Sequence, residues 1–169
     1  MPESFRPMPF SIETVRLSLR LRGAEDAACN LALLCEHEGG TTATLADVRE
    51  SLIRQRSKAL TAGIGLLSVQ RRAEGDRIGY CGLIVGRGSF GEPEIAYELL
   101  PRAHGFGYAT EAARAVLDAA FATGRQRIWS TVRAWNKPSL RVLEKIGFRP
   151  DHSVTDDRGE LIYLVRDAL

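Results

Sequence analysis

The stretch from Glu94 to Ala112 constrains the fold of this chain most strongly, because a strand pattern gives way to a helix pattern across two closely spaced glycines. The apolar run ends at Pro101, which lacks the N–H that a strand ladder needs, and small residues at helical spacing begin at Tyr108. The first amides of a helix have no internal partner and lie at the positive end of its dipole. Gly105 and Gly107 would let an anion approach those amides, so the junction predicts a phosphate-binding turn.

Composition limits the class of protein and the kind of partner. A length of 169 residues with 44% hydrophobic and 26% charged side chains is typical of one globular domain. The formal net charge of +2 is too small to indicate a nucleic-acid or membrane surface, so we expect small-molecule partners. The three cysteines, Cys29, Cys35 and Cys81, lack a metal-ligand spacing and are expected to be reduced thiols, with no metal site.

No stretch approaches the roughly 20 apolar residues of a membrane span. Residues 1–10 carry prolines and charges where a signal peptide would be apolar, so a cytoplasmic location is expected. We expect residues 1–11 to form a flexible lead and residues 12–169 to form a single domain.

The first half of the domain alternates between strand and helix patterns. Residues 15–21 predict a strand, and residues 24–38 and 45–62 predict helices, the second opened by Thr44 with Asp47 three residues later. That second helix is expected to carry one apolar face, made of Leu45, Val48, Leu52 and Ile53. The apolar runs 64–69 and 78–85, joined by a short polar loop, predict an antiparallel hairpin.

The second half contains a β-α-β unit. A glycine-rich loop at 86–93 leads to a strand at 94–100, a helix from Tyr108 to about Gly124 and a strand at 127–132, which should run parallel to the first. Asn136 is a candidate cap for a helix that reaches Lys145, and a strand at 160–165 should pair with residues around 153–155. The expected fold class is α/β of the α+β type: one twisted, mostly antiparallel mixed sheet with helices on both faces.

The order of these elements, the Arg102-x-x-Gly105-x-Gly107 loop and the segment from Asn136-x-x-Ser139 to Gly147-Phe148 together resemble the GNAT acyltransferases. The RimJ/RimL type of N-acetyltransferase is the most similar branch. The resemblance implies that the loop binds the pyrophosphate of acetyl-CoA. It also implies direct transfer of the acetyl group to a primary amine, which could be a protein N-terminus, an amino acid or another small amine. A monomer or a homodimer would fit this expectation.

The resemblance also implies a set of site residues. A backbone N–H of the strand, near Leu99 or Leu100, would stabilise charge on the thioester oxygen. The residues implied in binding the cofactor are Leu99, Leu100, Arg102, His104, Gly105, Phe106, Gly107, Tyr108, Ala109, Thr110, Asn136 and Ser139.

The acid and the base are less clearly indicated. Many GNAT enzymes carry a tyrosine acid at the position where this chain has Leu143. The resemblance to the RimJ/RimL branch implies that Ser139 contacts the sulfur instead, and because a serine hydroxyl is a poor acid we assign it a hydrogen bond to the departing thiolate. Glu94 and Glu98 share one face of their strand, and either could act as a base through water or be an ordinary ion-paired acid. Asn136 could contact the cofactor, cap its helix, or do both.

Several aromatic and imidazole side chains have simpler interpretations. Tyr97 and Trp129 are interpreted as core residues, and Trp135 as a residue bordering the substrate entrance. His104 is expected to point to solvent or to pack beside the cofactor.

Two other functions stay open. A non-catalytic acyl-CoA-binding or sensing module would explain the absent tyrosine. A site for ATP or NAD is disfavoured, because no Gly-Lys-Ser/Thr follows and the glycine spacing is one residue short of a dinucleotide fingerprint.

Overall fold

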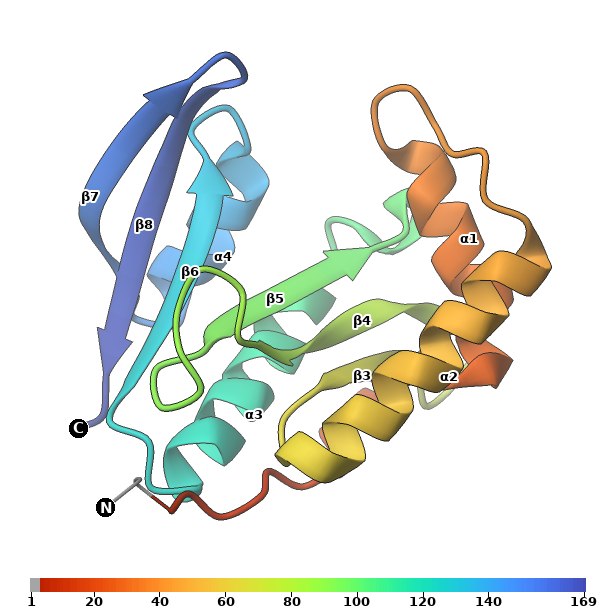
Figure 1. The fold of residues 1–169 in the computed structure, drawn as a ribbon, viewed down its shortest axis with the longest axis horizontal. Coiled ribbons are helices and arrows are strands. Elements are labelled where there is room, and N and C mark those ends of the chain that lie inside the picture. The colour runs from red at the N-terminus through yellow and green to blue at the C-terminus, as the bar shows by residue number, and fades with distance from the viewer. Residues whose placement is uncertain (1–3) are drawn as a thin grey trace.

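The computed structural model describes residues 4–169, which build one eight-stranded sheet with the strand order β1-β2-β3-β4-β5-β6-β8-β7 (Figure 1). The strands are β1 (Ser11–Glu13), β2 (Leu17–Leu21), β3 (Leu66–Arg71), β4 (Arg77–Ile84), β5 (Glu94–Leu99), β6 (Arg127–Arg133), β7 (Arg149–Asp156) and β8 (Gly159–Asp167). The helices are α1 (Ala27–Glu36), α2 (Leu45–Ala62), α3 (Tyr108–Ala122) and α4 (Lys137–Lys145), with short 3₁₀ turns η1 (Ala24–Asp26) and η2 (Pro101–Ala103).

The helices cover both faces of the sheet. Helices α1 and α2 lie on one face, and α3 lies on the other beneath β4 and β5, with α4 on the same side beside β6 (Figure 1). The inner face of α3 is built from small residues, with Ala112, Ala113 and Ala120 completely buried. Small side chains let this helix lie close to the sheet, which brings its N-terminus to the end of β5.

The sheet divides between β5 and β6. These two parallel strands register at a single pair, Glu94 with Trp129, and the Trp129 N–H donates to the Pro93 carbonyl at 2.9 Å. Beyond this point the strands diverge (Figure 1), while β6 continues to pair with β8 over its whole length. One edge of β5 is therefore released from its neighbour within the body of the sheet.

The main elements confirm the expected fold class. The 66–84 hairpin is antiparallel, β5 and β6 are parallel, and α2 has the bounds expected of it. Its cap is also confirmed: the Asp47 N–H donates to Thr44 Oγ1 at 3.1 Å, and the Thr44 N–H donates to Asp47 Oδ2 at 2.8 Å.

Four details differ from expectation. Within the predicted flexible lead, Met8 is buried and its N–H donates to the Gly63 carbonyl at 2.8 Å, and β1 begins at Ser11; residues 1–3 lie outside the described residues. The helix expected over 24–38 begins with a 3₁₀ turn and ends at Glu36. Of the four residues expected on the apolar face of α2, Leu45 and Ile53 are exposed, and Val48 and Leu52 are buried in a cluster with Ala27 of α1. Strand β7 is longer than expected because it pairs with β8 along its whole length.

None of the helices in residues 4–169 combines the length and the apolar character needed to cross a lipid bilayer.

Candidate functional site

The turn before α3 presents unpartnered backbone amides. Gly105 and Gly107 adopt positive φ angles of 83° and 79°, a backbone region that side-chain-bearing residues rarely occupy. Gly107 is the N-cap of α3 and supplies no side-chain cap, whereas α2 and α4 are capped by Thr44 and Asn136. No atom lies within 4 Å of where a Cβ on Gly105 would sit. The start of this 15-residue helix is therefore open to an anion.

Arg16 anchors this turn to the sheet. Its Nε pairs with Glu111 Oε2 at 2.7 Å, its Nη1 donates to the Phe106 carbonyl at 2.8 Å, and its guanidinium lies 4.4 Å from the centre of the Tyr108 ring. Burial opposes ionisation of Glu111, but hydrogen bonds from Thr14 and Arg16 outweigh it and lower the pKa of Glu111. Sequence reasoning missed this anchor, because it joins residues 95 positions apart.

Arg102 and His104 are engaged elsewhere. Arg102 pairs with Asp76 in the β3–β4 turn and donates to the Arg77 carbonyl at 3.0 Å. Hydrogen bonds from Arg71 and Arg102 lower the pKa of Asp76 to about 2, the Arg71 bond contributing most. His104 is exposed, as expected, but its Nε2 lies 2.8 Å from the Leu99 carbonyl, which can only accept, so Nε2 carries the proton.

Of the two amides expected to meet the thioester oxygen, Leu99 and Leu100, only that of Leu99 lies on the free edge of β5. The Leu100 N–H already donates to the Ile78 carbonyl on β4 at 2.8 Å, so it is not available to a thioester oxygen. The Ile95 carbonyl, in contrast, accepts from Ser130 on β6 at 3.4 Å. Because backbone groups alternate along a strand, the N–H groups of Tyr97 and Leu99 point toward β6, across the gap.

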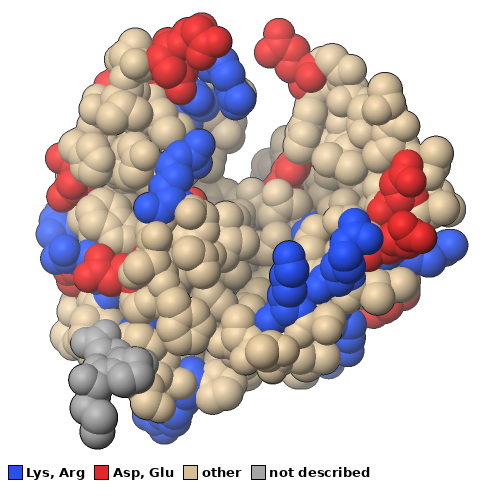
Figure 2. All heavy atoms as spheres, viewed as in Figure 1, with Lys and Arg blue, Asp and Glu red and all other residues tan. Residues whose placement is uncertain are grey.

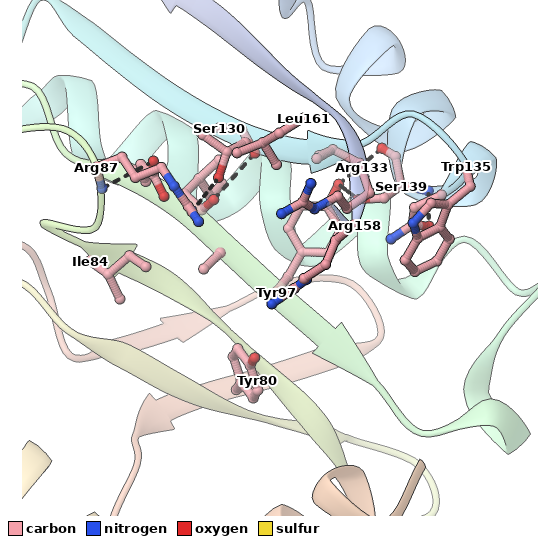
Figure 3. Close-up of a pocket in the computed structure, with 16 residues that line it drawn as sticks. Tyr80, Ile84, Arg87, Tyr97, Ser130, Arg133, Trp135, Ser139, Arg158 and Leu161 are labelled. Atoms are coloured by element: carbon pink, nitrogen blue, oxygen red, sulfur yellow. Dashed lines mark hydrogen bonds between the residues drawn. The ribbon is translucent and has the colours of Figure 1, made fainter. Parts of the chain in front are cut away.

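A cavity of about 350 Å³ lies at this gap (Figure 3). Tyr97 and Ser139 line it from the α3 and α4 side of the sheet, and Glu94 and Thr131 line it from the opposite side. The gap between β5 and β6 thus lets side chains from both faces of the sheet line a single cavity.

Glu94 and Glu98 have different surroundings. Glu94 is only 4% exposed and lines the cavity; burial raises the pKa of its carboxyl, although an N–H bond of 3.2 Å from Arg87 opposes the shift. Glu98 lies outside the cavity lining, where it accepts from the Tyr80 hydroxyl at 3.1 Å and contacts His37 Nε2 at 2.7 Å. Glu94, and not Glu98, therefore lines the same cavity as Ser139.

Ser139 has an unexpected partner. The Tyr97 hydroxyl lies 3.0 Å from Ser139 Oγ and 3.1 Å from the Ser139 carbonyl, and burial raises the pKa of Tyr97. Tyr97 is half-buried and packs against the core, as expected, but its hydroxyl is also hydrogen-bonded to Ser139. Strand alternation predicts the packing, because Tyr97 shares a face with the buried Ile95 and Leu99, but it does not predict the bond to Ser139.

Three further expectations concern the same region. Asn136 caps α4 as expected, accepting from the Ser139 N–H at 3.3 Å, and Leu143 is completely buried. Trp135 is 72% exposed and lines the cavity. Trp129 is only half-buried, and its indole N–H donates to Glu92 at 2.9 Å.

Within the described residues, no cluster of three or more His, Cys, Asp or Glu side chains could hold a metal ion.

The sequence of this chain matches a known protein family. Residues 16–149 match the family model described as the acetyltransferase (GNAT) domain. A curated relative, the uncharacterized protein YkkB of Bacillus subtilis (strain 168), is 38% identical over 88 residues, which is 50% of this chain. The match spans about half (51%) of that relative's length.

Solved structures share the fold over nearly the full length. A protein assigned to the GnaT acetyltransferase family from Bordetella pertussis is 26% identical, with a TM-score of 0.79 over 92% of this chain and 98% of its own. The ribosomal-protein-S5-alanine acetyltransferase of Vibrio fischeri, at 19% identity, shares the fold with a TM-score of 0.78 over 94% and 97%. Aminoglycoside acetyltransferase AAC(6')-Ib, solved in complex with coenzyme A, is 25% identical, with a TM-score of 0.71 over 89% and 94%.

Proposed function

The chain belongs to the GNAT acetyltransferase family, and on this premise we propose that it transfers an acetyl group from acetyl-CoA directly to a primary amine. The observation that carries the proposal is the single-pair register between β5 and β6, which leaves the edge of β5 open beside Glu94, Tyr97 and Ser139. A thioester laid along this edge would meet an amine arriving from the opposite face of the sheet.

The residues at the start of α3 fit the pyrophosphate of acetyl-CoA. The uncapped amides from Gly107 to Thr110, with the open surface at Gly105, supply donors and a favourable dipole for a phosphate. We assign His104, Phe106, Tyr108 and Ala109 to the walls of this site. Arg102 has a supporting role at most, because its guanidinium is paired with Asp76.

The edge of β5 supplies a donor for the reacting carbonyl. When bound, acetyl-CoA presents an acyl thioester, whose carbonyl oxygen gains negative charge as the amine attacks. A fixed backbone N–H aimed at that oxygen stabilises such charge without reorganising. We assign this role to the N–H of Leu99 or Tyr97, since the N–H of Leu100 is already bonded to Ile78.

Glu94 is the candidate base. An amine attacks only in its neutral form, so it must lose a proton on approach. The buried Glu94 carboxylate lines the cavity, and its raised pKa makes it a stronger base than an exposed glutamate. We propose that it takes the proton directly or through a water molecule.

Ser139, supported by Tyr97, faces the leaving sulfur. When the Tyr97 hydroxyl donates to Ser139 Oγ and not to the Ser139 carbonyl, the serine proton is free to bond to the departing thiolate. Burial raises the pKa of the Tyr97 hydroxyl, and a serine hydroxyl is a poor acid, so full proton transfer is not their main role. We propose hydrogen bonding by Ser139, oriented by Tyr97, in place of the tyrosine acid of other family members. Asn136 holds the turn that presents Ser139 and could also contact the cofactor.

Protein N-termini are the first acceptor class to test, because a ribosomal-protein-alanine acetyltransferase shares this fold. An α-amino group, with a pKa of about 8, is more often neutral than a lysine near 10.4. Free amino acids and other small amines are further candidates. We propose a cytoplasmic enzyme, acting as a monomer or a homodimer.

Release of the CoA thiol tests this function. The purified chain is mixed with acetyl-CoA and a panel of amines and N-terminal peptides, and free thiol is followed with a chromogenic reagent. We expect release that depends on the amine and on the protein. Tight binding of acetyl-CoA without release for any amine would contradict the proposal and favour a non-catalytic acyl-CoA-binding module.

A further inference from the structure

The acceptor side of the cavity is surrounded by arginines. Arg87 reaches it from the loop between β4 and β5, whereas Arg133 and Arg158 reach it from β6 and from the β7–β8 turn (Figure 3). Glu94 is the one carboxylate among the lining residues. Figure 2 shows the hollow between the two halves of the molecule, with blue side chains along the wall formed by the β6–β8 half.

Arg133 is already neutralised. Its Nη1 and Nη2 donate to the two carboxylate oxygens of Asp156 at 2.7 and 3.0 Å, and its Nη1 also donates to the Gly159 carbonyl at 3.0 Å. This pairing lowers the pKa of Asp156 to about 2. Arg133 therefore forms part of the cavity wall but contributes little net charge to it.

Arg87 and Arg158 retain their charges. Within residues 4–169, the Arg87 guanidinium makes one hydrogen bond, to the Thr131 hydroxyl at 3.3 Å. The charge of Arg158 contributes to the lowered pKa of Asp156. Among residues 4–169, however, no carboxylate lies within ion-pair distance of the guanidinium of Arg87 or Arg158. Three arginines line the cavity against the carboxylate of Glu94, which is influenced by Arg87, and the carboxylate of Asp156, which pairs with Arg133, so one positive charge is left in excess.

A substrate that matches this arrangement has two charged ends. Its amine would lie near Glu94, as the proposed function requires, and an anionic group would lie near Arg158 and Arg87. A guanidinium presents a planar fork of donors that binds a carboxylate through two parallel hydrogen bonds. A polycationic amine would instead place further positive charge against two unneutralised arginines.

We infer that the acceptor is a primary amine that also carries a carboxylate, which Arg158 binds with help from Arg87. This inference rests on the proposed function and narrows its substrate class. The same chemistry occurs in a small amino acid and in a protein N-terminus followed by an acidic residue. It disfavours aminoglycosides as acceptors of this chain.

Matched acceptor pairs test the inference. One pair is 4-aminobutanoate and 4-aminobutanamide; the other is the amidated peptides Ser-Asp-Ala and Ser-Asn-Ala, which differ in charge at nearly constant shape. The kcat/KM of CoA release is measured for each, and for kanamycin as a polycation. We expect kcat/KM to be about tenfold higher for the carboxylate member of at least one pair, since a charge-assisted pair typically contributes on that order. The pair that responds identifies the source as a small acid or a peptide.

Variants connect the effect to the two arginines. Arg158→Ala should remove most of the preference through KM, Arg158→Lys should keep part of it, and Arg87→Ala should reduce it while preserving the backbone N–H that bonds to Glu94. Arg54→Ala, an exposed residue of α2 outside the cavity lining, is the control and should change nothing.

The possible failures are distinguishable. Equal kcat/KM within both pairs, or a preference for kanamycin, would overturn the acceptor inference and leave the acetyltransferase function standing. A preference that survives Arg158→Ala and Arg87→Ala together would overturn the assignment to these arginines. Absence of release with every amine would overturn the proposed function and this inference with it.

Discussion

Tyr97 and Ser139 form a two-hydroxyl unit at the centre of the proposed chemistry. They lie 42 positions apart in the sequence, and their side-chain oxygens are 3.0 Å apart. The Ser139 N–H donates to the Asn136 side chain, and the Tyr97 hydroxyl is within hydrogen-bond distance of the Ser139 carbonyl, so both contacts hold Ser139 in place. Its hydroxyl is therefore oriented before any substrate binds, which is what a donor to a departing thiolate needs.

Ser139→Ala should lower kcat by roughly tenfold, the contribution of one hydrogen bond to a charged group, and leave the Kd of acetyl-CoA nearly unchanged. Tyr97→Phe should give a smaller loss, because the serine keeps its proton but loses its orientation. Steady-state kinetics and calorimetry measure the two quantities, with Ser153→Ala on the exposed β7 as the control. If kcat is unaffected in both site variants, the role assigned to this pair is wrong.

Glu94 allows a prediction about pH. Burial raises its pKa, and a base acts only when ionised, so kcat/KM should rise with pH through a limb above the ordinary carboxyl range near 4.3. Glu94→Gln should flatten this limb and reduce kcat/KM by about 10²-fold. Glu98→Gln is the matched control. A limb that is lost in Glu98→Gln and kept in Glu94→Gln would assign the base to Glu98.

The same raised pKa has a consequence for stability. The folded protein holds the Glu94 proton to a higher pH than the unfolded chain does, so stability falls as pH rises through that interval. Glu94→Gln should therefore melt at a higher temperature than the parent at neutral pH, and the difference should vanish below the ordinary carboxyl pKa. Thermal melts across pH measure it; an equal or lower melting temperature at neutral pH would show that Glu94 is not destabilised by burial.

At the scale of elements, the turn before α3 combines left-handed glycines, open space and the Arg16 anchor. Gly105 and Gly107 adopt left-handed conformations, yet their missing Cβ positions meet little of the protein, only Arg16 Nη2 at 3.5 Å from that of Gly107. Packing inside the protein therefore does not require glycine here. The backbone angle and the approach of a ligand remain as reasons for it.

Gly107→Val should raise the Kd of acetyl-CoA by about tenfold or more, since a side chain in this conformation strains the backbone by about 1–3 kcal/mol and obstructs the amides. Gly75→Val is a matched control, because Gly75 has a φ of 77° and equally open surroundings in the β3–β4 turn. It should lower stability by a similar amount but leave the Kd unchanged. Equal Kd values for parent and Gly107→Val would place the pyrophosphate elsewhere.

At the scale of the whole molecule, the sheet is two units joined at the Glu94–Trp129 pair. One unit runs from β1 to β5 and carries the phosphate turn; the other contains β6, β8 and β7 and carries Arg133 and Arg158. The site lies where they part, so each unit supplies residues that the other lacks.

The sequence predicted the features that depend on local chemistry. Pro101 ended a strand, glycines marked the turn, alanines marked the face of α3, and Asn136 marked a cap. It did not predict contacts between distant segments: the Tyr97–Ser139 bond, the pairing of Arg102 with Asp76, or the burial of Met8. The expectation that the Leu100 N–H stabilises the thioester oxygen was wrong for a related reason. The direction of that N–H depends on the register of β4 against β5.

Product analysis of one reaction tests the central claim most directly. The protein is incubated with acetyl-CoA and amidated Ser-Asp-Ala, and mass spectrometry of the peptide is compared with the amount of free CoA thiol. Direct transfer to an amine predicts one acetyl group on the N-terminal nitrogen for each thiol released, and no acetyl group retained on the protein. Release of thiol without an acetylated peptide, or a stable acetyl-protein, would contradict the account.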